Sequence, residues 1–170
     1  MTACRLHPQK NLKMMIDAFA MLEGDYPEYK LVIYGEGVLR QELEDYIGKL
    51  NLEGKILLPG FTNNILSEIS DCKVYLCSSD YEGISNSMLE AMGMGLPVIA
   101  TDCPVGGARM MIDNNVNGVL VPVGDSKAMY KEMKRILDDS NFAENLSKHA
   151  FEIRNRLPIA KIAEQWLKIM

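Results

Sequence analysis

Short apolar runs alternate along this chain with longer segments in which apolar residues recur at helical spacing. The runs have the composition of strands that are buried on both faces. We expect strands at residues 30–35, 55–61, 74–77, 98–100 and 118–123, with a further possible strand at 2–6. Because helical segments separate the strands, the pattern predicts an α/β fold with a doubly wound, mostly parallel, Rossmann-like sheet.

The clearest helical pattern follows Asn11, which is expected to cap a helix over residues 12–22. The apolar face of that helix is formed by Leu12, Met15, Ile16, Phe19 and Leu22. Asp125 or Ser126 is expected to cap a helix over residues 127–139. The remaining helices are expected at residues 38–50, 65–70, 87–92, 108–114, 142–154 and 159–168.

Length and composition indicate one globular domain over residues 1–170, with 48% hydrophobic and 24% charged residues. The possible first strand is short and is followed at once by a helix. We therefore expect either a truncated first strand or a chain that starts partway into a larger protein.

The net charge of −5 gives no general attraction to nucleic acid or anionic lipid. No apolar run approaches the roughly 20 residues that span a bilayer, and no signal peptide is visible. The four cysteines form no C-x-x-C pair and only two histidines accompany them, so no zinc site is expected. Reduced thiols in a cytoplasmic protein are the simplest interpretation.

The stretch Val74–Thr101 has the order strand, loop, helix, strand, and it carries the most specific chemistry of the chain. Parallel α/β sheets bind ligands at the carboxyl ends of their strands, where this loop is expected to lie. A helix start attracts anions, and a glycine there allows close approach of a ligand to the backbone. The residues expected at this helix start are Gly83, Ile84, Ser85, Asn86 and Ser87.

Two carboxylates flank these backbone donors, Glu82 before the helix and Glu90 inside it. Carboxylates accept hydrogen bonds from hydroxyls and offset positive charge that develops in a transition state. A ligand that is both polyhydroxylated and anionic would use both features, and a nucleotide sugar is such a ligand. A structural interpretation stays open, because Ser87-x-x-Glu90 is also a capping box and Glu82 is also typical of an exposed loop.

Other candidate contacts are less specific. Gly35 and Gly37 form a G-x-G after a strand, but Arg40 stands where the dinucleotide fingerprint has its third glycine, so a plain tight turn is favoured. Arg5 and Lys10 flank the start of the first helix and could pair with a diphosphate. They could equally be solvated surface residues.

These residues together resemble the C-terminal half of the retaining GT-B glycosyltransferases called glycosyl transferases group 1. The matching runs, in order, are RLHPQKNL, LVIYGEG, ILLPGF, SSDYEGISNSMLEAM, GLPVIATD and NGVLVPVGD. Glu82 and Glu90 match the family's E-x(7)-E motif. One departure is Met110, which stands where the family often has a glutamate.

The resemblance implies transfer of a sugar from a nucleotide donor, UDP- or GDP-linked, with retention and without a required metal. It implies that Arg5 and Lys10 hold the diphosphate and that residues 83–86 offer backbone N–H groups. By the same likeness Glu82 contacts the sugar, Glu90 binds the ribose, and Gly35, Gly37 and the segment near Pro59 lie by the base.

The resemblance also implies partners outside this chain. The family's N-terminal domain, which carries the site for a glycan or lipid-linked acceptor, has no counterpart in residues 1–170. We therefore expect little or no transferase activity from this chain alone. The branch that it resembles builds bacterial surface polysaccharides, which would place the full-length protein at the inner face of the membrane.

Alternatives of other classes are a nucleotide-sugar epimerase or a phosphorylase-like enzyme, and a non-catalytic nucleotide-binding or flavodoxin-like signalling module. Such a module would need an acidic cluster for Mg²⁺ or a flavin loop at the strand ends. Neither is assembled convincingly in this sequence.

Overall fold

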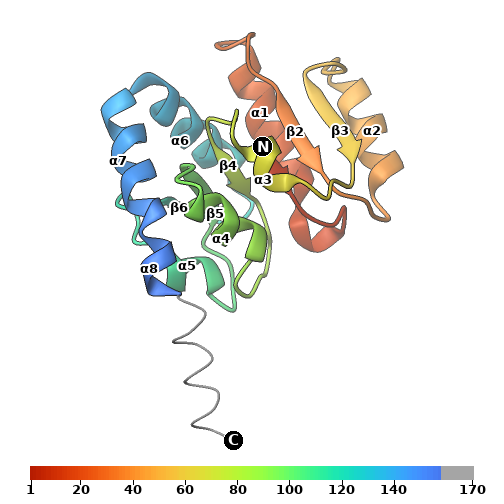
Figure 1. Cartoon of the computed structure of the whole chain (residues 1–170). Helices are drawn as coiled ribbons and strands as arrows, with labels where there is room; N and C mark the ends of the chain where they lie inside the picture. Colours follow the sequence, from red (N-terminus) through yellow and green to blue (C-terminus); the bar gives the residue numbers. More distant parts are fainter. Residues whose placement is uncertain (158–170) are drawn as a thin grey trace, which may run out of the picture.

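A computed structural model describes residues 1–157, in which strands alternate with helices as far as α6 and two further helices follow (Figure 1). The strands are β1 Thr2–Ala3, β2 Leu31–Tyr34, β3 Ile56–Gly60, β4 Tyr75–Cys77, β5 Val98–Thr101 and β6 Val119–Val121. The helices are the short 3-10 turn η1 Pro8–Lys10, α1 Leu12–Glu23, α2 Arg40–Lys49, α3 Ile65–Ile69, α4 Asn86–Gly93, α5 Gly107–Met111, α6 Ser126–Asp138, α7 Ser140–Phe151 and α8 Ile153–Arg156. The helix expected at 159–168 lies outside the described residues.

The strands form two parallel three-stranded sheets, β1-β2-β3 and β4-β5-β6. Met1 joins the two sheets, because its amine donates to the carbonyl of Val74 at 2.8 Å and its carbonyl accepts from the Leu76 N–H at 2.9 Å. The spatial order is therefore β3-β2-β1-β4-β5-β6, which reverses between β1 and β4. This arrangement confirms the predicted doubly wound parallel fold and places its switch point between those two strands.

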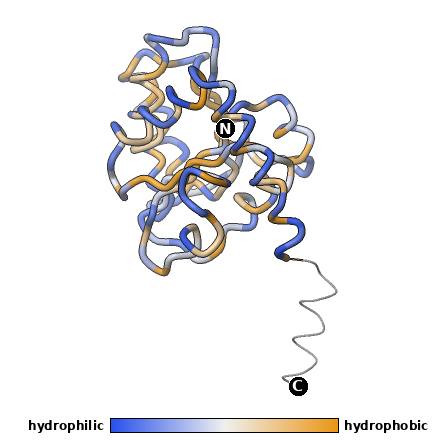
Figure 2. Tube along the Cα trace, turned by 90° about the vertical axis from the view of Figure 1, so that its left-hand side faces the viewer, coloured by the Kyte–Doolittle hydropathy of each residue, from blue (hydrophilic) through white to orange (hydrophobic). Residues whose placement is uncertain are grey.

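Strands β2, β4, β5 and β6 send alternate side chains into two separate apolar clusters, as the pleat of a strand requires. Leu76 and Ile99 belong to the cluster that holds α1 and α6, whereas Tyr75, Val98 and Ala100 belong to the cluster that holds α4 and α8. Helices thus cover both faces of the sheet. Hydrophobic positions follow the central strands and the helix faces that cover them (Figure 2).

Some boundaries differ from the sequence prediction. The regular part of the first strand is only Thr2–Ala3, although the Leu6 N–H still donates to the Glu36 carbonyl at 2.9 Å and keeps this segment beside the chain that follows β2. Helix α2 begins at Arg40, because the residues after Gly37 form a turn.

The C-terminal helices also depart from the expected single helix over 142–154. Asp139 caps α7 by accepting from the Phe142 N–H at 2.9 Å, so α7 begins earlier than expected. Helix α7 ends at Phe151, and after one residue the separate short helix α8 begins. Helix α5 ends at Met111 because the side chain of Asn117 binds the Met111 carbonyl at 3.0 Å.

Asn11 is the N-cap of α1, as predicted, and it has a second role. Its Oδ1 accepts from the Met14 N–H at 3.3 Å, and its Nδ2 donates to Asp80 Oδ1 at 2.6 Å. Its φ of 42° lies in the left-handed region, which asparagine tolerates better than most residues. Asn11 therefore fixes both the start of α1 and its distance from the loop after β4.

We predict that Asn11→Ala lowers the free energy of unfolding by about 2–3 kcal/mol, because it removes a cap and a side-chain hydrogen bond and strains the backbone. Asp125→Ala is the matched control: Asp125 caps α6 through Ala128 at 2.8 Å but has a negative φ. The control should lose only about 1 kcal/mol. Urea unfolding measures both, and equal losses would contradict the double role of Asn11.

Candidate functional site

The loops after β1 and β4 meet at the carboxyl ends of these strands. The Asp80 N–H donates to the Gln9 carbonyl at 2.9 Å, and Gln9 Nε2 donates to the Tyr81 carbonyl at 2.9 Å. Ser78 Oγ donates to the Lys10 carbonyl at 2.7 Å. These bonds hold the two loops together across the switch point, where a doubly wound sheet binds its ligand.

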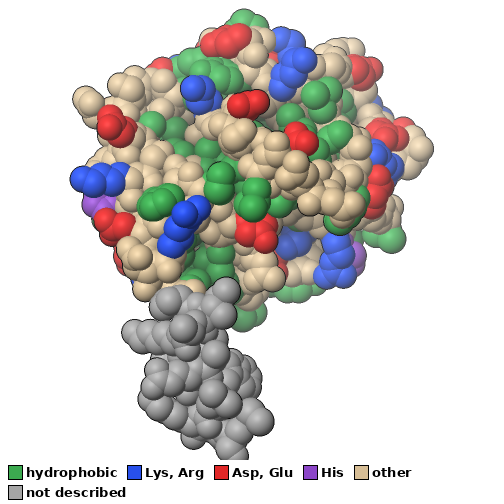
Figure 3. All heavy atoms as spheres, viewed as in Figure 1, with side chains coloured by type: hydrophobic (Ala, Val, Ile, Leu, Met, Phe, Trp, Pro, Cys, Tyr) green, Lys and Arg blue, Asp and Glu red, His purple; other side chains and the backbone are tan. Residues whose placement is uncertain are grey.

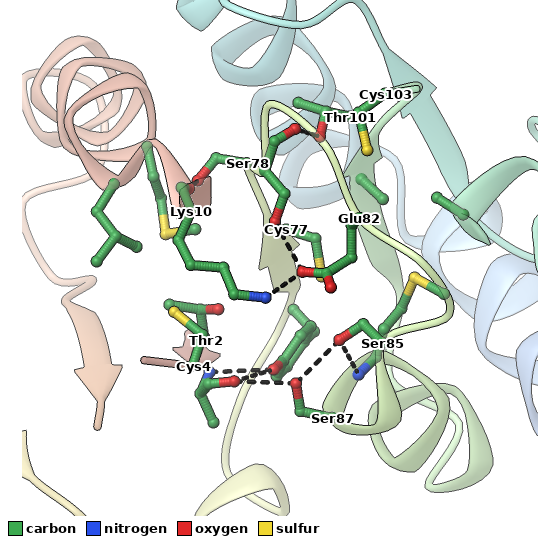
Figure 4. A pocket seen from close by; sticks show the side chains of 18 of the residues that line it. Thr2, Cys4, Lys10, Cys77, Ser78, Glu82, Ser85, Ser87, Thr101 and Cys103 are labelled. Carbon is green, nitrogen blue, oxygen red and sulfur yellow. Dashed lines mark hydrogen bonds and ion pairs between the residues drawn. The ribbon is translucent and has the colours of Figure 1, made fainter. Parts of the chain in front are cut away.

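Lys10 and Glu82 face one another across this junction and form an ion pair (Figure 4). Their side chains are only 16% and 23% exposed, and Ser79 Oγ also donates to Glu82 Oε2 at 3.3 Å. Low exposure strengthens the attraction relative to a fully solvated pair. The structure therefore brings together a cation and a carboxylate that the sequence predicts separately.

The start of α4 lies next to this pair. Ser85 is its N-cap and accepts from the Met88 N–H at 3.4 Å. Ser87 lies inside the helix, where its Oγ donates to the Ala3 carbonyl at 2.9 Å and ties α4 to the end of β1. Gly83 is exposed, and nothing lies within 4 Å of the position that a Cβ would take there.

The capping-box interpretation of Glu90 is wrong. It requires Ser87 as the cap, but Ser85 takes that place and Asn86 is the first helical residue. Within residues 1–157, no hydrogen bond links the exposed Glu90 carboxylate to the helix start. Glu90 therefore remains available to a ligand.

Two adjoining hollows open at this edge of the sheet. The inner pocket, of about 20 Å³, lies beneath the ion pair, and it is lined by Lys10, Glu82, Gly83, Ser85 and Ser87 together with Cys4, Cys77 and Cys103. The outer groove, of about 350 Å³, is lined by Arg5, Gly35, Glu36, Phe61, Thr62, Ile65 and Glu90. Ala3, Cys4 and Ser87 line both hollows, so the inner pocket, which has room for about one water molecule, adjoins the outer groove.

Glycines allow the loops around these hollows to touch. A Cβ on Gly35 would lie 1.9 Å from the Cys4 carbonyl oxygen, and one on Gly37 would lie 2.3 Å from that of Leu6. Both glycines therefore serve the predicted tight turn. Gly35 also lines the outer groove, whereas Gly37 packs against Leu6 and lines neither hollow.

Gly107, at the start of α5, is a contact that the sequence analysis did not assign. A Cβ there would lie 1.9 Å from the Gly83 carbonyl oxygen and 2.5 Å from the Ile84 nitrogen. The Glu82 N–H donates to the Pro104 carbonyl at 3.4 Å. The loop after β5 thus supports the loop that carries Glu82, and the glycine pair before the helix was the available signal.

The far wall of the outer groove comes from the segment just after Pro59, beside Gly35 as the resemblance implies, but the side chains that form it were not assigned. Phe61, which is 74% exposed, together with Thr62 and Ile65 follows the end of β3. Arg40, at the place of the missing third glycine, donates to Glu36 at 3.0 Å and to the Leu58 carbonyl at 3.0 Å. Arg40 thereby ties the loop after β2 to β3.

Burial keeps the thiols of the inner pocket neutral. It raises the pKa of Cys4 to about 11 and that of Cys77 to about 12. Among the residues that line the inner pocket, formal charge at neutral pH therefore comes from Lys10 and Glu82. Charged side chains of both signs are interspersed with apolar ones over the face in Figure 3, and no patch of one sign dominates it.

Two further observations concern the described residues as a whole. No group of three or more His, Cys, Asp or Glu side chains among residues 1–157 is placed to hold a metal ion. None of the helices in that range is long and apolar enough to cross a membrane.

The model of the family described as "Glycosyl transferases group 1" matches residues 2–153 of the chain. The chain belongs to this family.

One relative in this family is the N-acetylgalactosamine-N,N'-diacetylbacillosaminyl-diphospho-undecaprenol 4-alpha-N-acetylgalactosaminyltransferase of Campylobacter jejuni, 36% identical over 166 residues. That alignment covers 98% of this chain and 44% of the relative. The UDP-N-acetylglucosamine–peptide N-acetylglucosaminyltransferase GtfA subunit of Streptococcus agalactiae is 33% identical, with 98% and 34% covered. The chain thus spans less than half the length of these two relatives.

Solved structures of glycosyltransferases are also similar to this chain. TarM of S. aureus, in complex with Fondaparinux, alpha-GlcNAc-glycerol and UDP, has a TM-score of 0.92 at 28% identity, over 98% of this chain and 34% of TarM. The C-terminal domain of LpcC, a group 1 glycosyl transferase of Francisella tularensis, has a TM-score of 0.82 at 25% identity, over 91% of this chain and 83% of that one. The fold is therefore that of the C-terminal half of a GT-B glycosyltransferase, as predicted. Met110, the departure from the family pattern, is 61% exposed on α5.

Two glycine substitutions should show whether the loops after β4 and β5 are in close contact. We predict that Gly107→Ala lowers the free energy of unfolding by more than about 2 kcal/mol, because its methyl group meets the Gly83 backbone. Gly83→Ala meets open space and should stay within about 0.5 kcal/mol of wild type. Urea unfolding of the two variants checks this, and a stable Gly107→Ala protein would contradict the close contact of the two loops.

Proposed function

We propose that this chain is the donor-binding domain of a retaining glycosyltransferase and binds a nucleoside diphosphate sugar in the outer groove and over the mouth of the inner pocket. The observation that carries the proposal is the Lys10–Glu82 ion pair beside the start of α4, at the switch point of the sheet. A cation, a carboxylate and free helix N–H groups together match a ligand that is anionic at one point and hydroxylated at the next.

The outer groove would take the nucleoside. Its wall offers the exposed ring of Phe61 and the backbone near Gly35 to a base. The free carboxylate of Glu90 would accept hydrogen bonds from the ribose hydroxyls, and Arg5 lines the same groove. This order places the phosphates toward Lys10.

The diphosphate would lie between Arg5, Lys10 and the backbone of residues 83–86. As the bond from the anomeric carbon to the diphosphate breaks, negative charge grows on the leaving oxygen. Two basic side chains and a helix start stabilise that charge without a metal ion. Glu82 would accept hydrogen bonds from the transferred sugar and offset positive charge at its anomeric carbon.

The relatives favour UDP as the carrier. TarM and Anabaena HepE were both solved in complex with UDP, and the Campylobacter relative is named as acting on a diphospho-undecaprenol glycan. We therefore propose a UDP-sugar donor and a glycan or lipid-linked acceptor, used in bacterial surface polysaccharide synthesis at the inner face of the membrane. The acceptor would be bound by a part of the enzyme outside this chain.

We predict that UDP raises the melting temperature of the chain by several degrees at a concentration of 100 Kd, where binding adds about 2.7 kcal/mol to stability. The shift should be the same in EDTA and in Mg²⁺. Thermal unfolding with UDP, GDP and ADP measures it.

Lys10→Met is the matched variant for that experiment, since it keeps the length of the side chain and removes its charge. It should lose the stabilisation by UDP but keep any stabilisation by uridine. If none of the three nucleotides stabilised the wild-type chain, or if UDP did so only with Mg²⁺, the proposal would be wrong.

Glu90→Ala should weaken UDP binding about ten-fold or more, because it removes a charge-assisted hydrogen bond worth about 1.5–3 kcal/mol. It should leave the free energy of unfolding unchanged, because Glu90 caps nothing. Isothermal titration calorimetry gives the affinity. Glu144→Ala, which removes an exposed carboxylate on α7, is the control and should bind UDP as the wild type does.

A second ligand makes this test specific. With 2′,3′-dideoxy-UDP the wild type and Glu90→Ala should bind equally, because the hydroxyls that Glu90 would contact are gone. A loss of the same size for both ligands would show that Glu90 acts elsewhere than at the ribose.

A further inference from the structure

Helix α8 places two arginines against the C-terminal ends of α4 and α5, the two helices whose first residues border the donor site. We infer that Arg154 and Arg156 are positioning residues of the donor site, because they bind the C-terminal ends of the two helices whose N-terminal ends border that site. The inference rests on the proposed function, because the proposed function places the ligand's phosphates at the N-terminal ends of these helices.

Arg154 binds the end of α4. Its Nε donates to the carbonyl of Gly93, the last residue of α4, and its guanidinium lies 4.3 Å from the centre of the Phe151 ring. The last carbonyls of a helix have no partner within the helix, so an arginine there satisfies one of them and stabilises the negative end of the helix dipole. Since Gly93 leaves 3.8 Å between a would-be Cβ and Arg154 Nε, the guanidinium packs directly on the helix end.

Arg156 binds the end of α5 in the same way. Its two terminal nitrogens donate to the carbonyls of Met110 and Met111, each at 3.1 Å. Figure 1 shows α8 beside α5, on the side of the molecule away from the start of α1. Ile153, on the same turn, is buried in the cluster that contains α4.

The opposite ends of α4 and α5 are the ones that form the site. Helix α4 begins at Asn86, directly after Glu82 and Gly83. Helix α5 begins at Gly107, whose backbone touches that of Gly83. Because α4 is a rigid rod about 12 Å long, a shift at its C-terminal end moves the N–H groups at its start.

The positive charge at these helix ends should favour phosphate binding, as the packing of the arginines does. Arg154 places a cation at the C-terminal end of α4 and offsets the negative pole there, so the positive pole at the start acts on a bound anion with less opposition. Arg156 shares its charge with Asp113, whose Oδ2 lies 3.7 Å from its Nη1, and acts mainly by holding α5. The affinity for a ligand that carries a diphosphate should therefore depend on the two arginines, whereas the affinity for the same ligand without phosphates should not.

The test compares UDP with uridine by NMR titration of the full chain, which tolerates weak binding. In the double variant Arg154→Ala/Arg156→Ala, the ratio of UDP affinity to uridine affinity should fall about three-fold or more, with uridine affinity unchanged. The variant Arg154→Lys/Arg156→Lys keeps both charges and should keep most of the ratio. If the double alanine variant does not fold, the single variants Arg154→Ala and Arg156→Ala replace it, and each should lower the ratio by part of that amount.

Arg135→Ala is the matched control, because Arg135 is an exposed arginine whose partners lie outside α4 and α5: it donates to Asn115 at 2.8 Å and to Glu132 at 3.3 Å and stacks on Phe142. It removes one positive charge and some stability, and it should leave the ratio at the wild-type value. A wild-type ratio in the alanine variant, or equal losses for UDP and uridine, would overturn the inference. Failure of the wild-type chain to bind either ligand would instead refute the proposed donor site.

Discussion

The ion pair between Lys10 and Glu82 is the interaction on which the rest of the site depends, because it joins the two halves of the sheet at their junction. Each residue lies on a loop that follows a strand next to the switch point, and both side chains are largely buried. A largely buried charge without a partner is costly, so each of the two residues constrains the position of the other. In the absence of ligand, the pair therefore keeps the loops after β1 and β4 at a fixed separation.

Backbone contacts extend this constraint to the neighbouring loops. Gly35 allows the loop after β2 to touch Cys4, and Gly107 allows the loop after β5 to touch Gly83. In both places a side chain would occupy the space of a carbonyl group, so the contact depends on the residue being glycine. The loops of four strands thereby form one connected rim, in which Lys10 and Glu82 are the charged members of the inner pocket.

Sequence periodicity was enough to predict the fold, because helical and strand spacing are local properties and parallel strands impose the layered arrangement. It allowed Lys10 and Glu82 to reach the same edge, since both follow strands, but it left open whether Lys10 is a ligand contact or a solvated surface residue. It left the role of Glu90 open. Ser85 and Ser87 are equally good caps by residue type, and the choice between them depends on where the loop leaves β4 and on the bond from Ser87 to Ala3.

The wall formed by Phe61 and Ile65 was predictable only in part. The resemblance places the segment near Pro59 by the base, but which side chains line the groove depends on how β3 lies beside β2. Likewise, the break between α7 and α8 has no proline or glycine to mark it. Contacts between distant segments, such as that of Arg154 with Gly93, decide these features.

The two ends of α4 show how the fold keeps polar groups free for a ligand. At the C-terminal end, the Gly93 carbonyl is occupied by an arginine from another helix, whereas at the start a single serine caps the helix and Gly83 faces open space. A folded protein pairs nearly all of its buried polar groups, so those left unpaired lie where water or a ligand reaches them. The chain has thus satisfied the end of α4 that faces the protein and left open the end that faces the groove. That asymmetry, together with a Glu90 carboxylate that no side chain among residues 1–157 engages, explains why this edge of the sheet is suited to bind an anionic, hydroxylated molecule.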